Sequence, residues 1–188
     1  MNLIDIESLN AKEIEDIVSL ASQFRSDIGG FNQEPIYGDK KVGILFFEPS
    51  TRTKSSFEIA LLNLGAQYID IHPDSSSISK GESLENTIET LALMGIELFI
   101  IRHPDNVIYD LASKFTNLSF INAGAGITSH PTQALSDLLT VIEFKKDLSK
   151  LNISIIGDLD HSRVARSFIE LTKKIGCASL RFSGLPEL

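Results

Sequence analysis

The chain alternates short apolar runs with amphipathic helical stripes, and this alternation restricts its fold more than any other feature. A short, continuous apolar run is typical of a strand that is buried on both faces. Such runs occupy residues 41–47, 67–71, 98–102, 118–122, 153–156 and 179–182. Between most of them, apolar residues recur at helical spacing, in stripes that begin at Phe57, Leu84, Ala134 and Ala165. The pattern predicts an α/β fold, in which a parallel sheet is flanked by helices.

A further helix is predicted before the first strand. Asn10 and Glu13 are spaced as in a capping box, and the residues that follow place an apolar stripe on one helical face. Ile14, Ile17, Val18, Ala21 and Phe24 form that face.

Composition excludes several classes of protein. The 188 residues carry a formal net charge of −8, which removes the general attraction to nucleic acid and to anionic membrane surfaces. The apolar runs are far too short to span a bilayer, and the N-terminal residues lack the features of a signal peptide. Cys177 is the only cysteine, so no disulfide can form within the chain, and a reducing compartment is the simpler interpretation. We expect a cytoplasmic protein that binds neither nucleic acid nor membranes.

A polar stretch at residues 145–151 predicts a boundary within the chain. It would separate a first domain, residues 1–147, from residues 148–188, which supply only a strand, a helix and one more short strand. Because a segment of roughly 40 residues rarely makes an independent core, the second part either extends the first sheet or begins a second, incomplete α/β domain.

Polar segments follow the predicted strands, where open α/β sheets bind their ligands. The first contains Ser50, Thr51, Arg52 and Thr53, at the start of a helix. Hydroxyls, free backbone N–H groups, the positive end of the helix dipole and a guanidinium would converge there. Ordinary helix capping is the simpler alternative. We favour a site for a phosphate or another oxyanion, although the segment does not match a P-loop.

Two more strand ends carry basic groups with less specific surroundings. The second strand leads into a serine-rich stretch that contains Lys80, and its composition favours a solvated loop. The third strand ends at Arg102, which is costly to leave unpaired beside an apolar strand. A surface ion pair and a contact to a ligand are equally good interpretations of Arg102.

The fourth and fifth strand ends add a histidine and another arginine. His130 stands just before a predicted helix that has Pro131 at its first position, where a neutral imidazole could donate a hydrogen bond. A single histidine is more often structural than catalytic. Arg163 opens a helix, where a cation is unfavourable, so an anionic ligand is expected to hold it there.

The remaining signals exclude other kinds of chemistry. The histidines at 72, 103, 130 and 161 do not have zinc-ligand spacing, and no nucleophile elbow occurs in the chain, so no metal and no covalent intermediate are predicted. An edge of the sheet that is rich in cations and hydroxyls suits electrostatic activation of an anionic substrate.

Together these segments resemble the aspartate/ornithine carbamoyltransferase family, and most closely its aspartate branch. FFEPSTRTKSSFE (46–58) is similar to the family's carbamoyl-phosphate signature, and SHPTQALSDLLT (129–140) is similar to its H-P-x-Q segment. SKGES (79–83) and GDLDHSR (157–163) resemble loops of the aspartate branch. The resemblance runs in register from about residue 2 to the end of the chain.

The resemblance implies a role for each matching residue. Ser50, Thr51, Arg52 and Thr53 would hold the phosphate of carbamoyl phosphate, Arg102 and His130 would contact its carbonyl oxygen, and Gln133 would contact its amino group. Lys80 and either Ser76 or Ser77 would reach into the site of a neighbouring subunit. Lys80 and Arg163 would bind aspartate. The residues expected to act in catalysis are Arg52, Thr53, Arg102 and His130.

The resemblance also implies an activity and partners. The carbamoyl group of carbamoyl phosphate would pass to the amino group of L-aspartate, giving N-carbamoyl-L-aspartate and phosphate, in an early step of pyrimidine synthesis. A homotrimer with shared active sites is implied, with no metal or organic cofactor, and a regulatory subunit stays an open question.

The end of the chain at Leu188 departs from the family pattern. Members of the family carry a complete second domain, so we expect a C-terminally truncated chain in which residues 148–188 begin the aspartate-binding domain. One alternative is a truncated homologue that binds carbamoyl phosphate or a partner subunit without turnover. Another is an ornithine-type carbamoyltransferase, against which Glu48, Thr132 and the SKGES loop argue.

Overall fold

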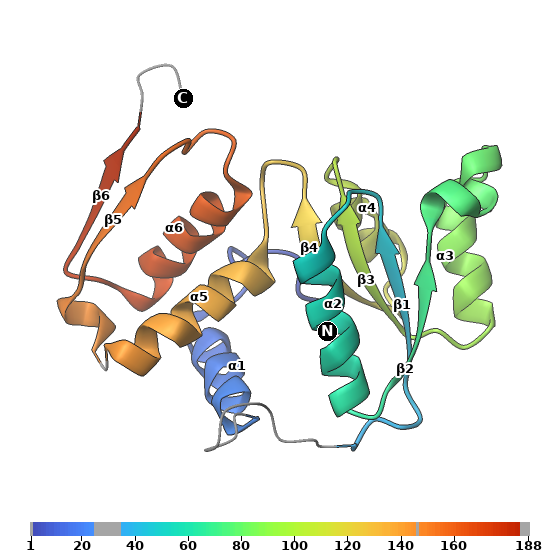
Figure 1. Ribbon diagram of the computed structural model, residues 1–188, viewed down its shortest axis with the longest axis horizontal. Helices are drawn as coiled ribbons and strands as arrows, with labels where there is room; N and C mark the ends of the chain where they lie inside the picture. Colours follow the sequence, from blue (N-terminus) through green and yellow to red (C-terminus); the bar gives the residue numbers. More distant parts are fainter. Residues whose placement is uncertain (1, 25–34, 146, 185–188) are drawn as a thin grey trace.

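The protein is an α/β chain with two separate parallel sheets, seen in a computed structural model that describes residues 2–24, 35–145 and 147–184. The strands are β1 (Lys41–Phe46), β2 (Gln67–Ile71), β3 (Leu98–His103), β4 (Ser119–Ala125), β5 (Asn152–Ile156) and β6 (Ser179–Ser183). The helices are α1 (Ala11–Gln23), α2 (Thr51–Asn63), α3 (Leu84–Leu93), α4 (Val107–Lys114), α5 (Pro131–Phe144) and α6 (Arg163–Ile175). Short 3₁₀ turns η1 (Pro73–Ser75), η2 (Ser77–Lys80) and η3 (Leu148–Lys150) complete the elements (Figure 1).

The larger sheet has four strands in the order β2-β1-β3-β4, and every pairing is parallel. The N-terminal segment extends it beyond β4, because Leu3 N donates to Phe120 O at 2.8 Å and Leu3 O accepts from Asn122 N at 2.9 Å. Each predicted strand is present, with bounds that differ by a few residues at most. Helix α4 was not predicted, although Ile108, Leu111, Ala112 and Phe115 fall at i, i+3, i+4 and i+7 and pack in one cluster, so the periodic signal was present but overlooked.

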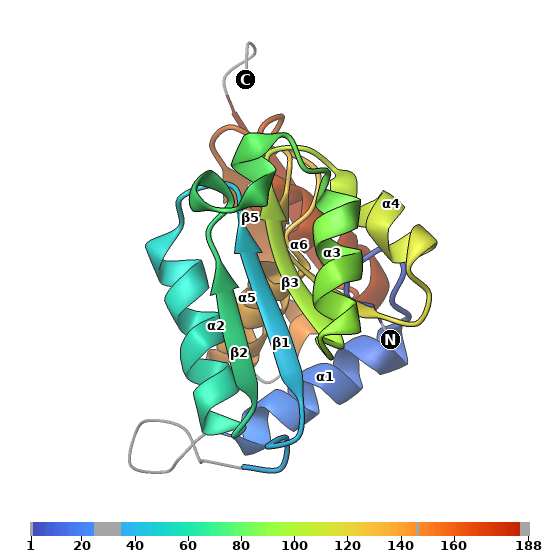
Figure 2. The ribbon, with the colours of Figure 1, turned by 90° about the vertical axis from the view of Figure 1, so that its right-hand side faces the viewer.

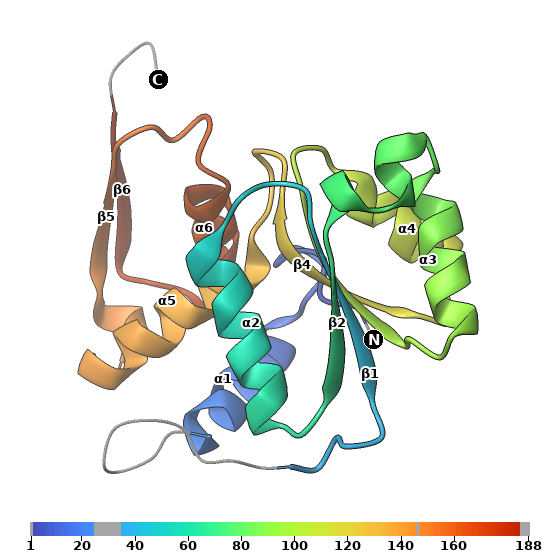
Figure 3. The same cartoon turned by 45° about the vertical axis from the view of Figure 1, so that its right-hand side comes forward.

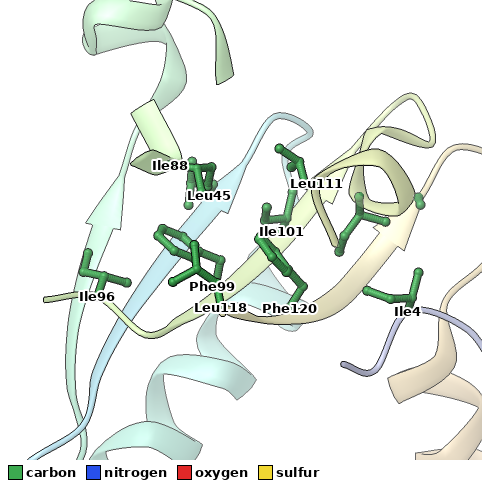
Figure 4. Close-up of a cluster of buried hydrophobic side chains, with 11 residues drawn as sticks. Ile4, Leu45, Ile88, Ile96, Phe99, Ile101, Leu111, Leu118 and Phe120 are labelled. Carbon is green, nitrogen blue, oxygen red and sulfur yellow. The ribbon is translucent and has the colours of Figure 1, made fainter. Parts of the chain in front are cut away.

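Helices cover both faces of the larger sheet, as predicted. Helix α2 lies on one face, while α3 and α4 lie on the other (Figures 2 and 3). The strands supply both layers by alternation, since Ile44 and Ile100 pack in the cluster under α2, whereas Leu45, Phe99 and Ile101 pack in the cluster under α3 and α4. Figure 4 shows the second of these clusters, where Phe99 and Phe120 stack with ring centroids 5.8 Å apart.

The smaller sheet pairs β5 with β6 in parallel and does not join the larger one. Of the two arrangements that the sequence allows for residues 148–188, extension of the first sheet is therefore wrong. Helix α6 connects the two strands and packs against α5, and Leu171 joins Leu135 and Leu138 of α5 in one buried cluster. Helix α1 completes this cluster with Ile14 and Val18. Its predicted capping box is present, because Asn10 and Glu13 exchange side-chain to backbone hydrogen bonds.

Parallel strands direct their carboxyl ends to one edge, and here the amino-terminal ends of α2, α5 and α6 gather beside that edge (Figure 1). Apolar packing on both sides of the larger sheet thus holds several loops in fixed positions. Across the described ranges, no helix is both long and apolar enough to cross a bilayer.

One buried side chain braces the β4 end of this edge. Asn122 is fully buried: its Nδ2 donates to Ile4 O at 2.7 Å, and its Oδ1 accepts from Gly124 N at 2.8 Å. The amide therefore ties the N-terminal segment to the end of β4. An apolar side chain of similar size would leave Gly124 N without its partner and Ile4 O with only the longer bond of 3.3 Å from Ser129 Oγ.

We predict that Asn122→Leu lowers the free energy of unfolding by about 1–3 kcal/mol, because it leaves the buried Gly124 N unpaired and removes the shorter of the two hydrogen bonds to Ile4 O. Denaturant unfolding followed by circular dichroism would measure the loss. Asn86→Leu, at an exposed position of α3, is the matched control and should change stability by less than about 0.5 kcal/mol. Equal losses in the two variants would contradict this role of Asn122.

Candidate active site

An open cavity of about 980 Å³ lies where the two halves of the structure meet, at the carboxyl edge of the larger sheet. Its walls come from the β1–α2 connection, the end of β3 and the first turns of α5 and α6. The lining residues are Pro49, Ser50, Thr51, Arg52, Thr53, Ser56, Phe57, Ala60, Arg102, His130, Thr132, Gln133, Ser136, Arg163 and Val164. The structure thus brings together most of the residues that the sequence predicted for a single site.

The first turn of α2 forms one wall and is open to an anion. Ser50 is the N-cap, yet its side chain makes no capping hydrogen bond, and the first turn contains no acidic residue. The first N–H groups of a helix have no partner within the helix, and the helix dipole adds positive potential at that end. With Thr51, Arg52 and Thr53 beside these groups, the turn has the donors that a phosphate needs.

Two arginines form the opposite wall and share one carboxylate. Arg163 Nη2 donates to Glu48 Oε2 at 2.9 Å, and Arg102 Nε lies 3.2 Å from the same oxygen. Arg163 Nη1 also donates to Gly126 O at 2.8 Å, and Arg102 Nη1 donates to Ala123 O at 3.4 Å. The side chains of Arg102 and Arg163 are only 14% and 16% exposed, so both cations are held in place.

The electrostatics of this pair depend on Glu48. Burial and the neighbouring Arg163 lower the pKa of Arg102, while Glu48 acts in the opposite direction. Arg102 Nε is nevertheless buried without a hydrogen bond of good geometry, so the guanidinium keeps unused donor capacity. The sequence predicted that an anionic ligand holds Arg163 at its helix start. In the structure the side chain of Glu48 supplies a negative charge there, and contact with a ligand stays a prediction.

A close backbone approach makes room for the two guanidiniums. Gly124 has φ +124, a conformation that residues with a side chain rarely adopt. A Cβ atom at this position would lie 3.2 Å from Arg102 Nη1 and 3.2 Å from Arg163 Cζ. Gly124 therefore lets both cations pack against the backbone near the end of β4.

His130 occupies the N-cap of α5 and is 5% exposed. Its backbone N–H donates to Ser167 Oγ of α6 at 2.8 Å, and its Nδ1 lies 3.4 Å from Thr132 Oγ1. Burial, and then the positive charges of Arg102 and Arg163, lower the pKa of His130 from 6.5 to about 4. The neutral imidazole predicted from the sequence is therefore present near pH 7, with burial as its main cause.

Gln133 contributes an amide to the same wall as His130. Its Nε2 donates to Asp137 Oδ1, one turn further along α5, at 2.9 Å. Gln133 lines the cavity but Asp137 does not. Asp137 and Ser167 were not singled out from the sequence, although the spacing of four residues between Gln133 and Asp137 is a usable signal for side-chain pairing.

The predicted site residues Ser76 and Lys80 lie outside the cavity of this chain. Ser76 caps η2: its Oγ donates to Pro73 O at 2.9 Å and accepts from Ile78 N at 3.3 Å. Ser77 and Lys80 are exposed, at the beginning and end of the same turn. In the described part of the chain, no group of three or more metal-ligating side chains comes together.

The geometry defines a class of protein: an α/β fold with a candidate oxyanion site at the carboxyl edge of a parallel sheet, lined by a helix N-terminus, guanidiniums and a neutral imidazole. Residues 1–143 match the family model described as aspartate/ornithine carbamoyltransferase, carbamoyl-P binding domain. The chain belongs to the aspartate/ornithine carbamoyltransferase family.

Curated relatives place the chain near the aspartate branch. It is 44% identical over 183 residues to the aspartate carbamoyltransferase catalytic subunit of Caldanaerobacter subterraneus, covering 97% of this chain and 60% of that protein. It is 46% identical over 175 residues to the catalytic subunit of the same name from the Wolbachia of Culex pipiens, covering 93% and 59%. The chain thus spans about 60% of the length of the curated relatives that it matches.

Solved structures agree with this relationship. A putative aspartate carbamoyltransferase from Trypanosoma cruzi matches with a TM-score of 0.86 and 31% identity, over 95% of this chain and 58% of that one. A T. cruzi aspartate transcarbamoylase solved with carbamoyl phosphate and aspartate matches with a TM-score of 0.84 and 32% identity, over 95% and 55%. The ornithine carbamoyltransferase of Pyrococcus furiosus matches with a TM-score of 0.84 and 26% identity, over 97% and 57%.

The buried His130 predicts a specific pH dependence of stability. Its pKa is about 4 in the folded chain and 6.5 in the reference state, so the unfolded chain binds the extra proton first as the pH falls. The folded state keeps its full free energy of unfolding above pH 6.5. As the pH falls from 6.5 to 4, protonation of His130 in the unfolded chain lowers that free energy by about 3 kcal/mol. We expect the unfolding free energy of the wild type to fall more steeply over this window than that of His130→Gln.

Denaturant titrations at several pH values measure these slopes, and His161→Gln, which removes an exposed imidazole, serves as the control. Parallel curves for the wild type and His130→Gln would show that the imidazole is not held neutral by the fold.

Proposed function

We propose that this chain carries the carbamoyl-phosphate half of an aspartate carbamoyltransferase. In the proposed reaction, the carbamoyl group of carbamoyl phosphate passes to the amino group of L-aspartate, giving N-carbamoyl-L-aspartate and phosphate. The observation that carries the proposal is the convergence of the open α2 turn, Arg102, His130 and Gln133 on one cavity. The names of the curated relatives and of the T. cruzi structures support this choice of substrates.

The proposed binding mode assigns one substrate group to each wall. The donors of Ser50, Thr51, Arg52 and Thr53 hold the phosphate at the end of α2, where the dipole favours a dianion. Arg102 and the neutral His130 donate to the carbonyl oxygen, and Gln133 meets the amino group. Arg163 binds a carboxylate of aspartate with the guanidinium donors that Gly126 and Glu48 leave free.

The chemistry then needs no nucleophile from the protein. The amine of aspartate attacks the carbamoyl carbon, and the negative charge that develops on the carbonyl oxygen meets Arg102 and His130, which are already in place. The bond to the bridging oxygen breaks, and the departing phosphate accepts the proton of the amine. A neutral His130 suits this task because it donates a hydrogen bond without adding a third positive charge beside Arg102 and Arg163.

We also propose a shared site and a two-part chain. Because Lys80 is exposed and remote from the cavity of its own chain, it would complete the aspartate site of a neighbouring subunit together with Ser76, within a homotrimer. Residues 1–147 form the carbamoyl-phosphate domain and residues 148–188 the first part of the aspartate domain. The existence of two separate sheets supports that division. A cytoplasmic location and a place early in pyrimidine synthesis complete the proposal.

The direct test is the formation of N-carbamoyl-L-aspartate from carbamoyl phosphate and aspartate, measured by chromatography alongside phosphate release. We predict that Arg52→Ala lowers turnover or carbamoyl-phosphate affinity by roughly 10- to 100-fold, as expected for the loss of charge-assisted hydrogen bonds. Arg181→Ala, at an exposed position of β6 outside the cavity, should leave both unchanged.

The outcomes separate the alternatives. Binding of carbamoyl phosphate that depends on Arg52, without any product, would identify a binding unit that has no transferase activity by itself. Turnover with ornithine in preference to aspartate would identify the other branch of the family. A chain that neither binds carbamoyl phosphate nor forms product would disprove the proposal.

The shared site has its own test. We predict that Lys80→Ala and Arg52→Ala each lower activity by roughly 10- to 100-fold alone, and that a mixture of the two, dissociated and reassembled, regains part of the lost activity. In a hybrid trimer, some sites would combine the intact Arg52 of a Lys80→Ala chain with the intact Lys80 of an Arg52→Ala chain. A mixture that stays as inactive as its components would contradict the sharing of sites between subunits.

A further inference from the structure

Asp137 lies one helical turn beyond the cavity and contacts a residue that lines it. Its Oδ1 accepts a hydrogen bond of 2.9 Å from Gln133 Nε2, and both residues are half-buried on the same face of α5. Asp137 is absent from the cavity wall, so it has no direct access to a ligand there. Apart from the general effect of its charge on any anion in the cavity, Asp137 can influence a ligand only through Gln133.

The contact decides which end of the Gln133 amide faces the cavity. A carboxylate has only acceptor lone pairs, so only the NH₂ end of an amide can face it. With Nε2 turned toward Asp137, the planar amide leaves Oε1 as the group available to the cavity. Without a neighbour of this kind the two ends of the amide would be nearly interchangeable, because their shapes are almost the same.

We propose that Asp137 is a positioning residue that makes this site selective for a ligand with an N–H donor beside its carbonyl carbon. The inference rests on the proposed function, and it assigns the preference for a carbamoyl group over an acetyl group to the Gln133–Asp137 pair. The NH₂ of a carbamoyl group can donate to Gln133 Oε1, whereas the methyl of an acetyl group of similar size would leave that oxygen unpaired.

Two stable probes isolate this preference. Phosphonoacetamide and acetonylphosphonate each carry a phosphonate and a carbonyl separated by a methylene, and they differ only in an NH₂ against a CH₃ group. Their affinities for the purified chain can be compared by isothermal titration calorimetry. A change in net charge at residue 137 alters the affinity of both anions alike, so the ratio of the two affinities reports the amide orientation alone.

We expect the wild type to prefer the amide probe by about three- to tenfold, as one hydrogen bond gained or left unmade implies. Asp137→Asn can donate to Gln133 Oε1 and so admits the opposite orientation, and Asp137→Ala leaves the amide free to turn. Both should bring the ratio toward one. Asp137→Glu keeps an acceptor and should retain a preference. Glu89→Gln, an exposed charge change on α3, should leave the ratio at its wild-type value.

A second set of variants shows whether the effect passes through Gln133. In a Gln133→Ala background, Asp137→Asn should no longer change the ratio. Far-ultraviolet circular dichroism of each variant checks that the helix is intact, and Asp137→Asn is nearly isosteric with the wild type.

The outcomes are distinct from those that test the proposed function. A wild type that binds both probes equally, or Asp137 variants that are folded and keep the full preference, would overturn the role of Asp137 and leave the proposed function standing. A wild type that binds neither probe would overturn the proposed function and this inference together.

Discussion

The parallel pairing of β1 with β3, and of β3 with β4, is the constraint on which the rest of the molecule depends. Because these strands run in one direction, their carboxyl ends lie at the same edge of the sheet. That edge therefore carries Glu48, Arg102 and Gly124. The crossover helices must return to the opposite edge, which places their N-termini beside those groups. Close apolar packing on both faces of the sheet holds the strands in place (Figure 4). The polar groups at the edge are therefore held in fixed positions as well.

Cations that are held close together repel one another, and the structure shows how this electrostatic repulsion is offset. Burial is the main cause of the lowered pKa values of Arg102 and His130, and the neighbouring positive charges act in the same direction. Glu48 partly neutralises the pair, and His130 stays uncharged because it is buried. The result is a cavity whose donors are arranged before any ligand arrives, which is the property that electrostatic stabilisation of a developing negative charge requires.

Much of the architecture could be predicted from local patterns. The strands, the capping box of α1 and the clustering of the α2 turn, Arg102 and His130 at one edge all follow from spacing and from the rule that parallel strands share a carboxyl edge. Arg163 follows β5 of the smaller sheet, so its place beside that edge depends on how the two sheets pack. Helix α4 was missed although its apolar residues have helical spacing, because the segment is only eight residues long. Glu48 appeared in the sequence as part of a motif, but nothing in its neighbours indicated that it would pair with an arginine 115 positions away.

The periodicity of apolar residues and the chemistry of a few motifs were sufficient to define an α/β chain, its family and most of the residues around its cavity. These features depend on neighbours within one or two turns, which a linear sequence displays directly. Contacts between distant segments required the folded chain: the anion that holds Arg163, the burial that keeps His130 neutral, and the separation of β5 and β6 into a sheet of their own. Burial and ion pairing arise from how whole elements pack, so no local pattern can specify them.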